Sequence, residues 1–142
     1  MTLDLGSAQA IVTGALAEAR RISAKPLAVI VLDAGGHPVA FAREDGASLF
    51  RFDIARAKAT GALGMGDDTR VLAERAKGNP AFFQSVTVAV GGNIAFSPGG
   101  VLIRSADGLL GAVGISGDTG DIDEECALAG LRAAGFNRDN AA

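Results

Sequence analysis

The feature that most restricts the fold is the grouping of strand-like segments along the chain. An unbroken apolar run at 27–32 has the pattern of a central strand. A glycine-containing turn at 33–37 leads from it directly into an alternating segment at 39–43. Two strands joined by so short a connection are typical of a hairpin, so the sequence predicts an antiparallel pair.

The remaining segments extend this grouping. Apolar periodicity predicts four helices, at about 4–23, 49–65, 69–77 and 121–134. Turn sequences separate three further predicted strands, at 94–97, 101–104 and 109–116. Residues 81–90 fit either a helical turn or a strand. Because strands come in groups and do not alternate with helices, we expect an antiparallel sheet flanked by helices, an α+β arrangement within the broad α/β class, and not a doubly wound parallel sheet.

Length and cysteine content limit the organisation of the chain. Its 142 residues match one ordinary domain, which we place at 1–142, and 49% apolar residues suffice for a core. Cys126 is the single cysteine, so no internal disulfide forms, which fits a reducing compartment. The N-terminus lacks the pattern of a secretory signal, and the longest apolar run is too short to cross a bilayer. We therefore expect a cytoplasmic protein without a membrane partner.

The charge pattern argues against nucleic acid as a partner. The net charge is −3, and no run of Lys or Arg stands out. Trp and Tyr are absent, which leaves Phe as the only aromatic side chain for base stacking. Nucleic-acid binding generally needs a basic patch, so we expect a small-molecule partner instead.

Two cations fall on an apolar arc of the helix predicted at 49–65. On a helical wheel, Arg51 and Lys58 lie among Ile54 and Met65. A buried unpaired cation is costly, so these side chains would face a carboxylate, a solvent-filled cleft or an anionic ligand. Alternatively the opposite face is buried and the two cations extend to solvent. That opposite face carries Phe52, Ala59 and Leu63.

Arg43 ends the alternating strand, and alternation places it on the same face as Val39 and Phe41. It would then point to the core side at the edge of the sheet, where the rim of a ligand pocket is expected, with Asp45 in the following loop. The structural alternative is an ion pair of Arg43 with Asp45 or with Asp53.

His37 is the only histidine and lies in the predicted turn, where we expect it to be exposed. A Ser-His-Asp triad would depend on this one imidazole, and a multi-histidine metal site is excluded. His37 is therefore the sole imidazole for acid–base work or metal ligation.

An acidic segment precedes the last predicted helix. Asp121 and Glu124 have the spacing of a capping box, and acidic residues in a first turn suit the helix dipole. The weaker alternative is a hard-cation site, because four carboxylates fall within seven residues. These four are Asp118, Asp121, Asp123 and Glu124. Cys126, on the helix that follows, is expected to be a buried and inert thiol.

Several ordered motifs resemble the GlcG/HbpS family, which also supplies the C-terminal domain of PduO-type adenosyltransferases. The resemblance covers residues 5–136. Its motifs are DAGGHPVAFAREDGA at 33–47, ARAKAT at 55–60, PGGVLI at 98–103, and GAVGISGD at 111–118 with Asp123-Glu124 behind it. It implies a profilin-like sandwich, with an antiparallel sheet of about five strands and helices on both faces. It also implies a homo-oligomer, from dimer to octamer, and some members bind haem.

This chain departs from the haem-binding members, which are similar in using a histidine ligand near the first helix or the turn that follows it. That helix has no histidine here, so His37 is the only candidate axial ligand. We expect an oligomeric protein that binds haem or another small organic anion. The residues expected to hold the ligand are Arg43, Asp45, Arg51, Lys58, Gly99 and Gly100.

Two other functions are compatible with the sequence. The chain could be an enzyme, such as an isomerase, tautomerase or lyase, with a carboxylate near Lys58 as base and Arg43 orienting a small carboxylate substrate. It could also be an oligomer without a ligand, in which Arg43 and Lys58 are fully paired with protein carboxylates.

Overall fold

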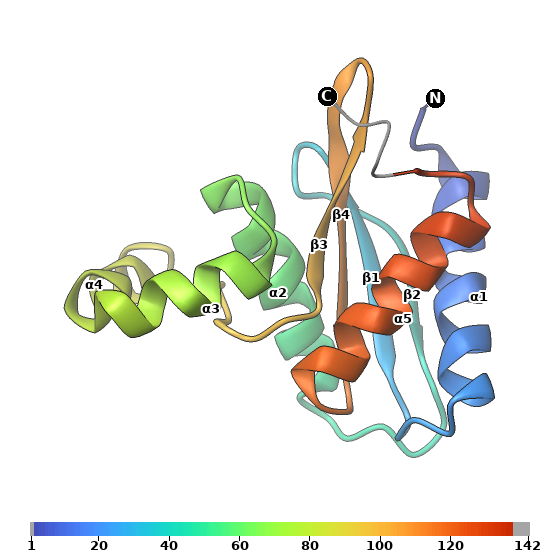
Figure 1. The fold of residues 1–142 in the computed structure, drawn as a ribbon, viewed down its shortest axis with the longest axis horizontal. Coiled ribbons are helices and arrows are strands. Elements are labelled where there is room, and N and C mark those ends of the chain that lie inside the picture. The colour runs from blue at the N-terminus through green and yellow to red at the C-terminus, as the bar shows by residue number, and fades with distance from the viewer. Residues whose placement is uncertain (1, 138–142) are drawn as a thin grey trace.

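The computed structural model describes residues 2–137, and Figure 1 shows their arrangement. The helices are α1 (Leu5–Arg21), α2 (Arg51–Met65), α3 (Thr69–Gly78), α4 (Pro80–Ala89) and α5 (Gly120–Ala133). The strands are β1 (Ala28–Asp33), β2 (Pro38–Arg43), β3 (Gly100–Ser105) and β4 (Gly108–Ser116).

The strands form one sheet in the order β2-β1-β4-β3, and every neighbouring pair is antiparallel. At one end of the sheet, Ala28 of β1 lies opposite Arg43 of β2 and Ser116 of β4. At the other end, Asp33 lies opposite Gly111. The predicted antiparallel pairing is confirmed, but the sheet of the described residues has four strands and not about five.

The strand predicted at 94–97 is wrong, because these residues form no strand. Ile94 packs so closely on α2 that a Cβ atom added to Gly61 would lie 2.6 Å from its Cγ1 atom. The ring of Phe96 meets that of Phe83 edge to face, with 5.3 Å between the centroids. The ambiguous segment at 81–90 belongs mostly to α4, which begins at Pro80, a residue favoured in the first turn of a helix.

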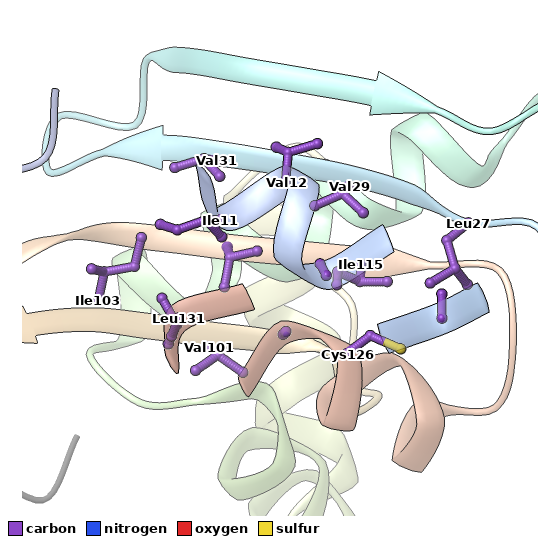
Figure 2. Packing of buried hydrophobic residues seen from close by; sticks show 14 of the residues in the cluster. Ile11, Val12, Leu27, Val29, Val31, Val101, Ile103, Ile115, Cys126 and Leu131 are labelled. Atoms are coloured by element: carbon purple, nitrogen blue, oxygen red, sulfur yellow. The ribbon is translucent and has the colours of Figure 1, made fainter. Parts of the chain in front are cut away.

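Helices cover both faces of the sheet, as predicted. Alternation along β1 sends Val29 and Val31 to one face, where they pack with α1 and α5 (Figure 2). It sends Ala28 and Ile30 to the other face, where they pack with α2. The apolar run at 27–32 is thus buried on both sides, which explains why it does not alternate in polarity.

The face predicted for Val39, Phe41 and Arg43 is only partly right. The pairing of β1 with β2 shifts register after Val31, where Leu32 pairs with Pro38, and this irregularity moves Val39 out of alternation. Val39 packs against the cluster under α1 and α5. The ring of Phe41 meets that of Phe52 on α2 instead, at 5.0 Å between centroids.

Helices α3 and α4 project from the sheet as an arm (Figure 1). Helix α3 contacts α2 and β3, whereas α4 packs mainly against α3. Within α4 only Phe83 is buried. None of the helices formed by residues 2–137 combines the length and the apolar character needed to cross a bilayer.

Candidate functional site

Lys58 and Asp123 form a buried ion pair at one end of the sheet. The Lys58 Nζ atom lies 2.9 Å from Asp123 Oδ2 and donates a second hydrogen bond of 2.9 Å to the Ile115 carbonyl. The side chains are 3% and 1% exposed. The ammonium group therefore meets a carboxylate, which was one of the partners expected for it, and is shielded from solvent.

Two glycines leave the space that Lys58 occupies, one beside its side chain and the other beside its main chain. A Cβ atom on Gly99, whose φ is 127°, would lie 2.8 Å from Lys58 Nζ. A Cβ atom on Gly100 would lie 2.5 Å from the Lys58 carbonyl oxygen. The close approach that the sequence suggested for this glycine pair is therefore made to the chain's own lysine.

Burial shifts the titration of both charged groups. Desolvation lowers the pKa of Lys58 from its ordinary value, and the Asp123 carboxylate opposes this shift. Desolvation likewise raises the pKa of Asp123, and the Lys58 ammonium opposes it. Asp123 Oδ1 also accepts a hydrogen bond from the Asp118 N–H at 3.0 Å, so both of its oxygens are occupied.

Helix α2 turns a different face to the sheet from the arc centred on Ile54. Its sheet-facing cluster contains Ala55, Ala59 and Ala62, with Phe52 and Leu63 packed against them. The opposite face expected in the alternative does pack on the sheet, but Gly61 and Ala62 of the Ile54 arc are buried as well, so the alternative is right only in part. It is wrong about the lysine, however, because Lys58 is 2% exposed and does not extend to solvent.

The other predicted ligand-binding cations lie near this pair without joining it. Arg51 Nη1 donates to the buried Ser116 Oγ at 3.2 Å. Arg43 lies two strands from Ser116, since Ala28 pairs with both, and it is exposed. Arg43 donates to the Ala47 carbonyl at 2.8 Å, and among the described residues it forms no ion pair with Asp45 or Asp53.

Arg43 and Asp45 border an open hollow of about 420 Å³ on the outside of the molecule. Arg20 and Glu44 line the same hollow and are paired with each other at 3.0 Å. The hollow thus holds two guanidinium groups and two carboxylates, and its charges largely balance.

The acidic residues before α5 are engaged by other parts of the chain. Asp118 accepts hydrogen bonds from the N–H groups of Lys25 and Thr119. Arg70 of α3 binds Asp121 at 2.5 Å and Glu124 at 2.9 Å. Among residues 2–137, no group of three or more His, Cys, Asp or Glu side chains could hold a metal ion.

The predicted capping box of Asp121 and Glu124 is wrong. Thr119 is the N-cap of α5, and its hydroxyl accepts from the Ile122 N–H at 3.3 Å. Thr is a preferred N-cap residue, and its position two residues earlier frees Asp121 and Glu124 to meet Arg70.

Cys126 is buried in the cluster under α1 and α5 (Figure 2). Burial raises the pKa of its thiol to about 12, and nearby carboxylates add to the shift. The thiol is therefore protonated at neutral pH and sealed from solvent, as expected from its helical position.

His37 lies at the opposite end of the sheet from Lys58. It follows Asp33, which pairs with Gly111, whereas Lys58 bonds to Ile115 near the far end of β4. Its side chain is 80% exposed, and its Nδ1 atom lies 3.3 Å from Asp33 Oδ1. The same carboxylate oxygen accepts the backbone N–H groups of Gly35 and His37, which lowers the pKa of Asp33.

A groove that the sequence did not predict lies between α1 and the edge strand β2. It measures about 430 Å³ and begins two residues after His37. Leu5, Gln9, Val12, Thr13, Val39, Ala40 and Phe41 line it. Five of these seven residues are apolar, with Gln9 and Thr13 adding polar groups. Leu5 and Phe41 are 56% and 41% exposed, but only the packing of α1 beside β2 brings them together.

Comparison with known proteins places the chain among described relatives. Residues 3–132 match the family model "Haem degrading protein HbpS-like". A search of curated proteins found no match.

Solved structures of similar fold cover nearly the whole chain. A double mutant of HbpS from Streptomyces reticuli is 27% identical, with a TM-score of 0.80 over 95% of this chain and 88% of that one. A structure described as a PduOC:haem complex is 24% identical, with a TM-score of 0.85 over 96% and 98%. The protein ORFY from Klebsiella pneumoniae is 23% identical, with a TM-score of 0.87 over 97% and 94%.

Proposed function

The chain belongs to the HbpS-like family, and from that premise we propose that it binds haem in the groove between α1 and β2, with His37 as the axial ligand. The observation that carries the proposal is that the only histidine precedes by two residues Val39, which lines an open groove together with other apolar side chains. Two descriptions support it: the matching family model is that of a haem-degrading protein, and one solved structure of the same fold is described as a haem complex.

The groove has the size of a small-molecule site, and apolar and polar groups share its lining. Its volume of about 430 Å³ lies within the range of small-molecule sites, roughly 300–1,000 Å³. Leu5 and Phe41 keep large exposed apolar surfaces that a macrocycle would cover. Gln9 and Thr13 offer an amide and a hydroxyl to polar substituents of the ligand.

His37 has the chemistry of an iron ligand. A ligating histidine commonly directs its second ring nitrogen to a carboxylate, which fixes the orientation of the ring and raises the basicity of the ligating nitrogen. The Nδ1 atom of His37 already lies 3.3 Å from Asp33, so Nε2 is left for the metal. The Cα atoms of His37 and Val39 are at most about 7 Å apart along the chain, so the imidazole is attached close to a residue that lines the groove.

The other described side chains that could ligate iron fit less well. Cys126 is buried and its thiol is protonated at neutral pH. Met65 lines a different hollow at the end of α2. A bound haem would supply an iron centre for ligand binding or redox chemistry, while the protein's own residues orient the imidazole and cover one side of the macrocycle.

The enzymatic alternative and the anion site at Lys58 receive less support. A general base beside Lys58 would have to reach a substrate, yet both members of the buried pair are closed from solvent. For a small organic anion, the hollow at Arg43 offers an exposed guanidinium, although Glu44 and Asp45 reduce its attraction.

The test is a titration with haemin followed at the Soret band, using wild type, His37→Ala and Arg43→Ala. We expect the wild-type spectrum to shift, His37→Ala to weaken binding at least tenfold, and Arg43→Ala to match wild type. Both positions are exposed, so thermal melting should show both variants folded. An unchanged spectrum in wild type would contradict the proposal, and loss of binding only in Arg43→Ala would move the site to the other end of the sheet.

A further inference from the structure

One wall of the open hollow at the end of β2 has charges that are already paired. Arg20 and Glu44 form this wall, with 3.0 Å between Arg20 Nε and Glu44 Oε2. Glu44 Oε1 also accepts the Leu27 N–H at 2.9 Å. Arg20 donates two further hydrogen bonds, to the carbonyls of Ala24 and Lys25. Because these two side chains neutralise each other, the other charged residues of the hollow decide what it attracts.

Arg43 is the second cation of the hollow, and most of its hydrogen-bond donors are unused. Its Nη1 atom donates to the Ala47 carbonyl at 2.8 Å, which ties the guanidinium group to the loop after β2. A guanidinium group carries five N–H donors. Among residues 2–137, Arg43 makes no other hydrogen bond and no ion pair. The group therefore keeps donors in the fork geometry that suits a carboxylate.

Asp45 is the second carboxylate of the hollow, and within the described part of the chain it has no partner. It follows Glu44 in a tight turn that the Ala47 N–H closes by donating to the Glu44 carbonyl at 3.1 Å. Gly46 comes next with a φ of 88°, the left-handed conformation that a type II turn places at its third position. The turn leaves Asp45 exposed, so its carboxylate is open to a ligand.

Two opposite charges thus line one hollow without pairing with each other. A simple anion would be attracted by Arg43 and repelled by Asp45, and for a simple cation these effects are reversed. A small zwitterion satisfies both residues, because its carboxylate can accept from the guanidinium group while its ammonium group donates to the carboxylate. The charge pattern therefore favours a ligand that carries both signs close together.

Pro26 adds an apolar surface to the same hollow. A Cβ atom on Gly46 would lie 3.5 Å from Pro26 Cγ, so the turn that carries Asp45 packs on the proline ring. The volume of about 420 Å³ lies within the range of small-molecule sites, roughly 300–1,000 Å³. The hollow therefore has room for an apolar side chain beside the two charged groups of a ligand.

We propose that this hollow binds a free α-amino acid with an apolar side chain. The carboxylate of the amino acid binds Arg43, its ammonium group binds Asp45, and its side chain lies against Pro26. Arg43 pairs with Ala28 at the end of the sheet away from His37, so this site is separate from the proposed haem groove and does not depend on it.

The test is an amide NMR titration of isotopically labelled protein with L-leucine, L-leucinamide and isocaproate. Leucinamide lacks the carboxylate of leucine and isocaproate lacks its ammonium group, while both keep the apolar side chain. We expect L-leucine to shift the amide signals of residues 43–47 until they saturate. Each analogue should bind about tenfold more weakly or worse, because it loses one set of charge-assisted hydrogen bonds.

Three variants at exposed positions complete the test. Arg43→Ala and Asp45→Ala should each weaken L-leucine binding about tenfold, whereas Asp107→Ala, in the turn between β3 and β4, should leave it unchanged.

Asp45→Ala should also bind isocaproate more tightly than wild type does, because it removes the carboxylate that repels an anion, an effect that damage to the fold would not produce. The absence of shifts at 43–47 with millimolar L-leucine would overturn the proposal. So would equal binding of isocaproate and L-leucine to wild type, which would indicate a simple anion site.

Discussion

Lys58 of α2 and Asp123 of α5 belong to helices that cover opposite faces of the sheet, yet their side chains meet at 2.9 Å beside Gly99. The pair links the two helical layers at the end of the sheet where β3 begins. Its burial and its complete set of hydrogen-bond partners assign it to the architecture, and the proposed ligand site lies at the other end.

Replacing one member of this ion pair should destabilise the fold more than replacing both members. Lys58→Met leaves Asp123 buried without its partner, and we expect a loss of about 3–5 kcal/mol in the free energy of unfolding, measured by denaturant titration. The double variant Lys58→Met/Asp123→Leu should lose less than the single variant. Arg70→Gln, which removes an ion pair exposed to solvent, should change the free energy of unfolding far less than Lys58→Met does. Additive losses in the double variant would contradict the interpretation.

A substitution at Gly100 tests how closely the main chain of α2 approaches the start of β3. A Cβ atom there would lie 2.5 Å from the Lys58 carbonyl oxygen and 2.6 Å from Thr69 Cγ2, so Gly100→Ala should destabilise the protein by about 1–3 kcal/mol. Gly78→Ala is the control, because no atom lies within 4 Å of its Cβ position. Equal melting temperatures for the two variants would show that the backbone approach is looser than described.

Acid should weaken the fold through carboxylates whose pKa is lowered by backbone N–H donors. The N–H groups of Lys25 and Thr119 lower the pKa of Asp118 below 3.8 in the folded state. A depressed carboxylate pKa contributes stability that is present above the unfolded value and is lost as the pH falls through the folded value.

The corresponding measurement is a series of thermal melts from pH 7 to pH 2.5. Wild type should be more stable than Asp118→Asn at pH 7, and the gap should narrow once the pH falls below 3.8. A gap that stays constant or widens in acid would show that Asp118 does not act through its charge.

Cys126 should resist thiol reagents while the protein is folded. A pKa of about 12, against an ordinary value of 9.0, lowers the thiolate fraction at pH 8 about 1,000-fold, and burial slows access further. We expect modification by iodoacetamide only at the rate of unfolding, with rapid reaction in denaturant. Fast labelling of the folded chain would contradict the burial of α5.

Local patterns in the sequence predicted most of the fold. The unbroken run at 27–32, the hairpin and helices α1, α2, α3 and α5 follow from apolar periodicity and turn residues. The segment at 94–97 was wrongly predicted as a strand because Ile94 and Phe96 are residue types common in strands. Their side chains pack against α2 and α4 and do not belong to the sheet. That packing depends on contacts with residues distant in sequence, which periodicity does not encode.

The site was harder to predict than the fold. The wheel detected that Lys58 needed a partner, but the partner lies on α5, 65 residues away along the chain. Strict alternation placed Val39 and Phe41 on one face of the sheet, and no sequence pattern indicated the register irregularity in β2 that puts them on different faces. The groove beside α1 appears only once α1 lies against the edge strand, so no motif could have indicated it.

The most direct test of the proposed function is to locate a bound porphyrin by amide NMR. Gallium protoporphyrin IX is diamagnetic and shares the shape of haem, so it can be titrated into isotopically labelled protein. We predict chemical-shift changes concentrated at 5–13 and 37–41, around the groove and His37. Changes concentrated instead around Arg51, Lys58 and Gly99, with the groove unaffected, would contradict it.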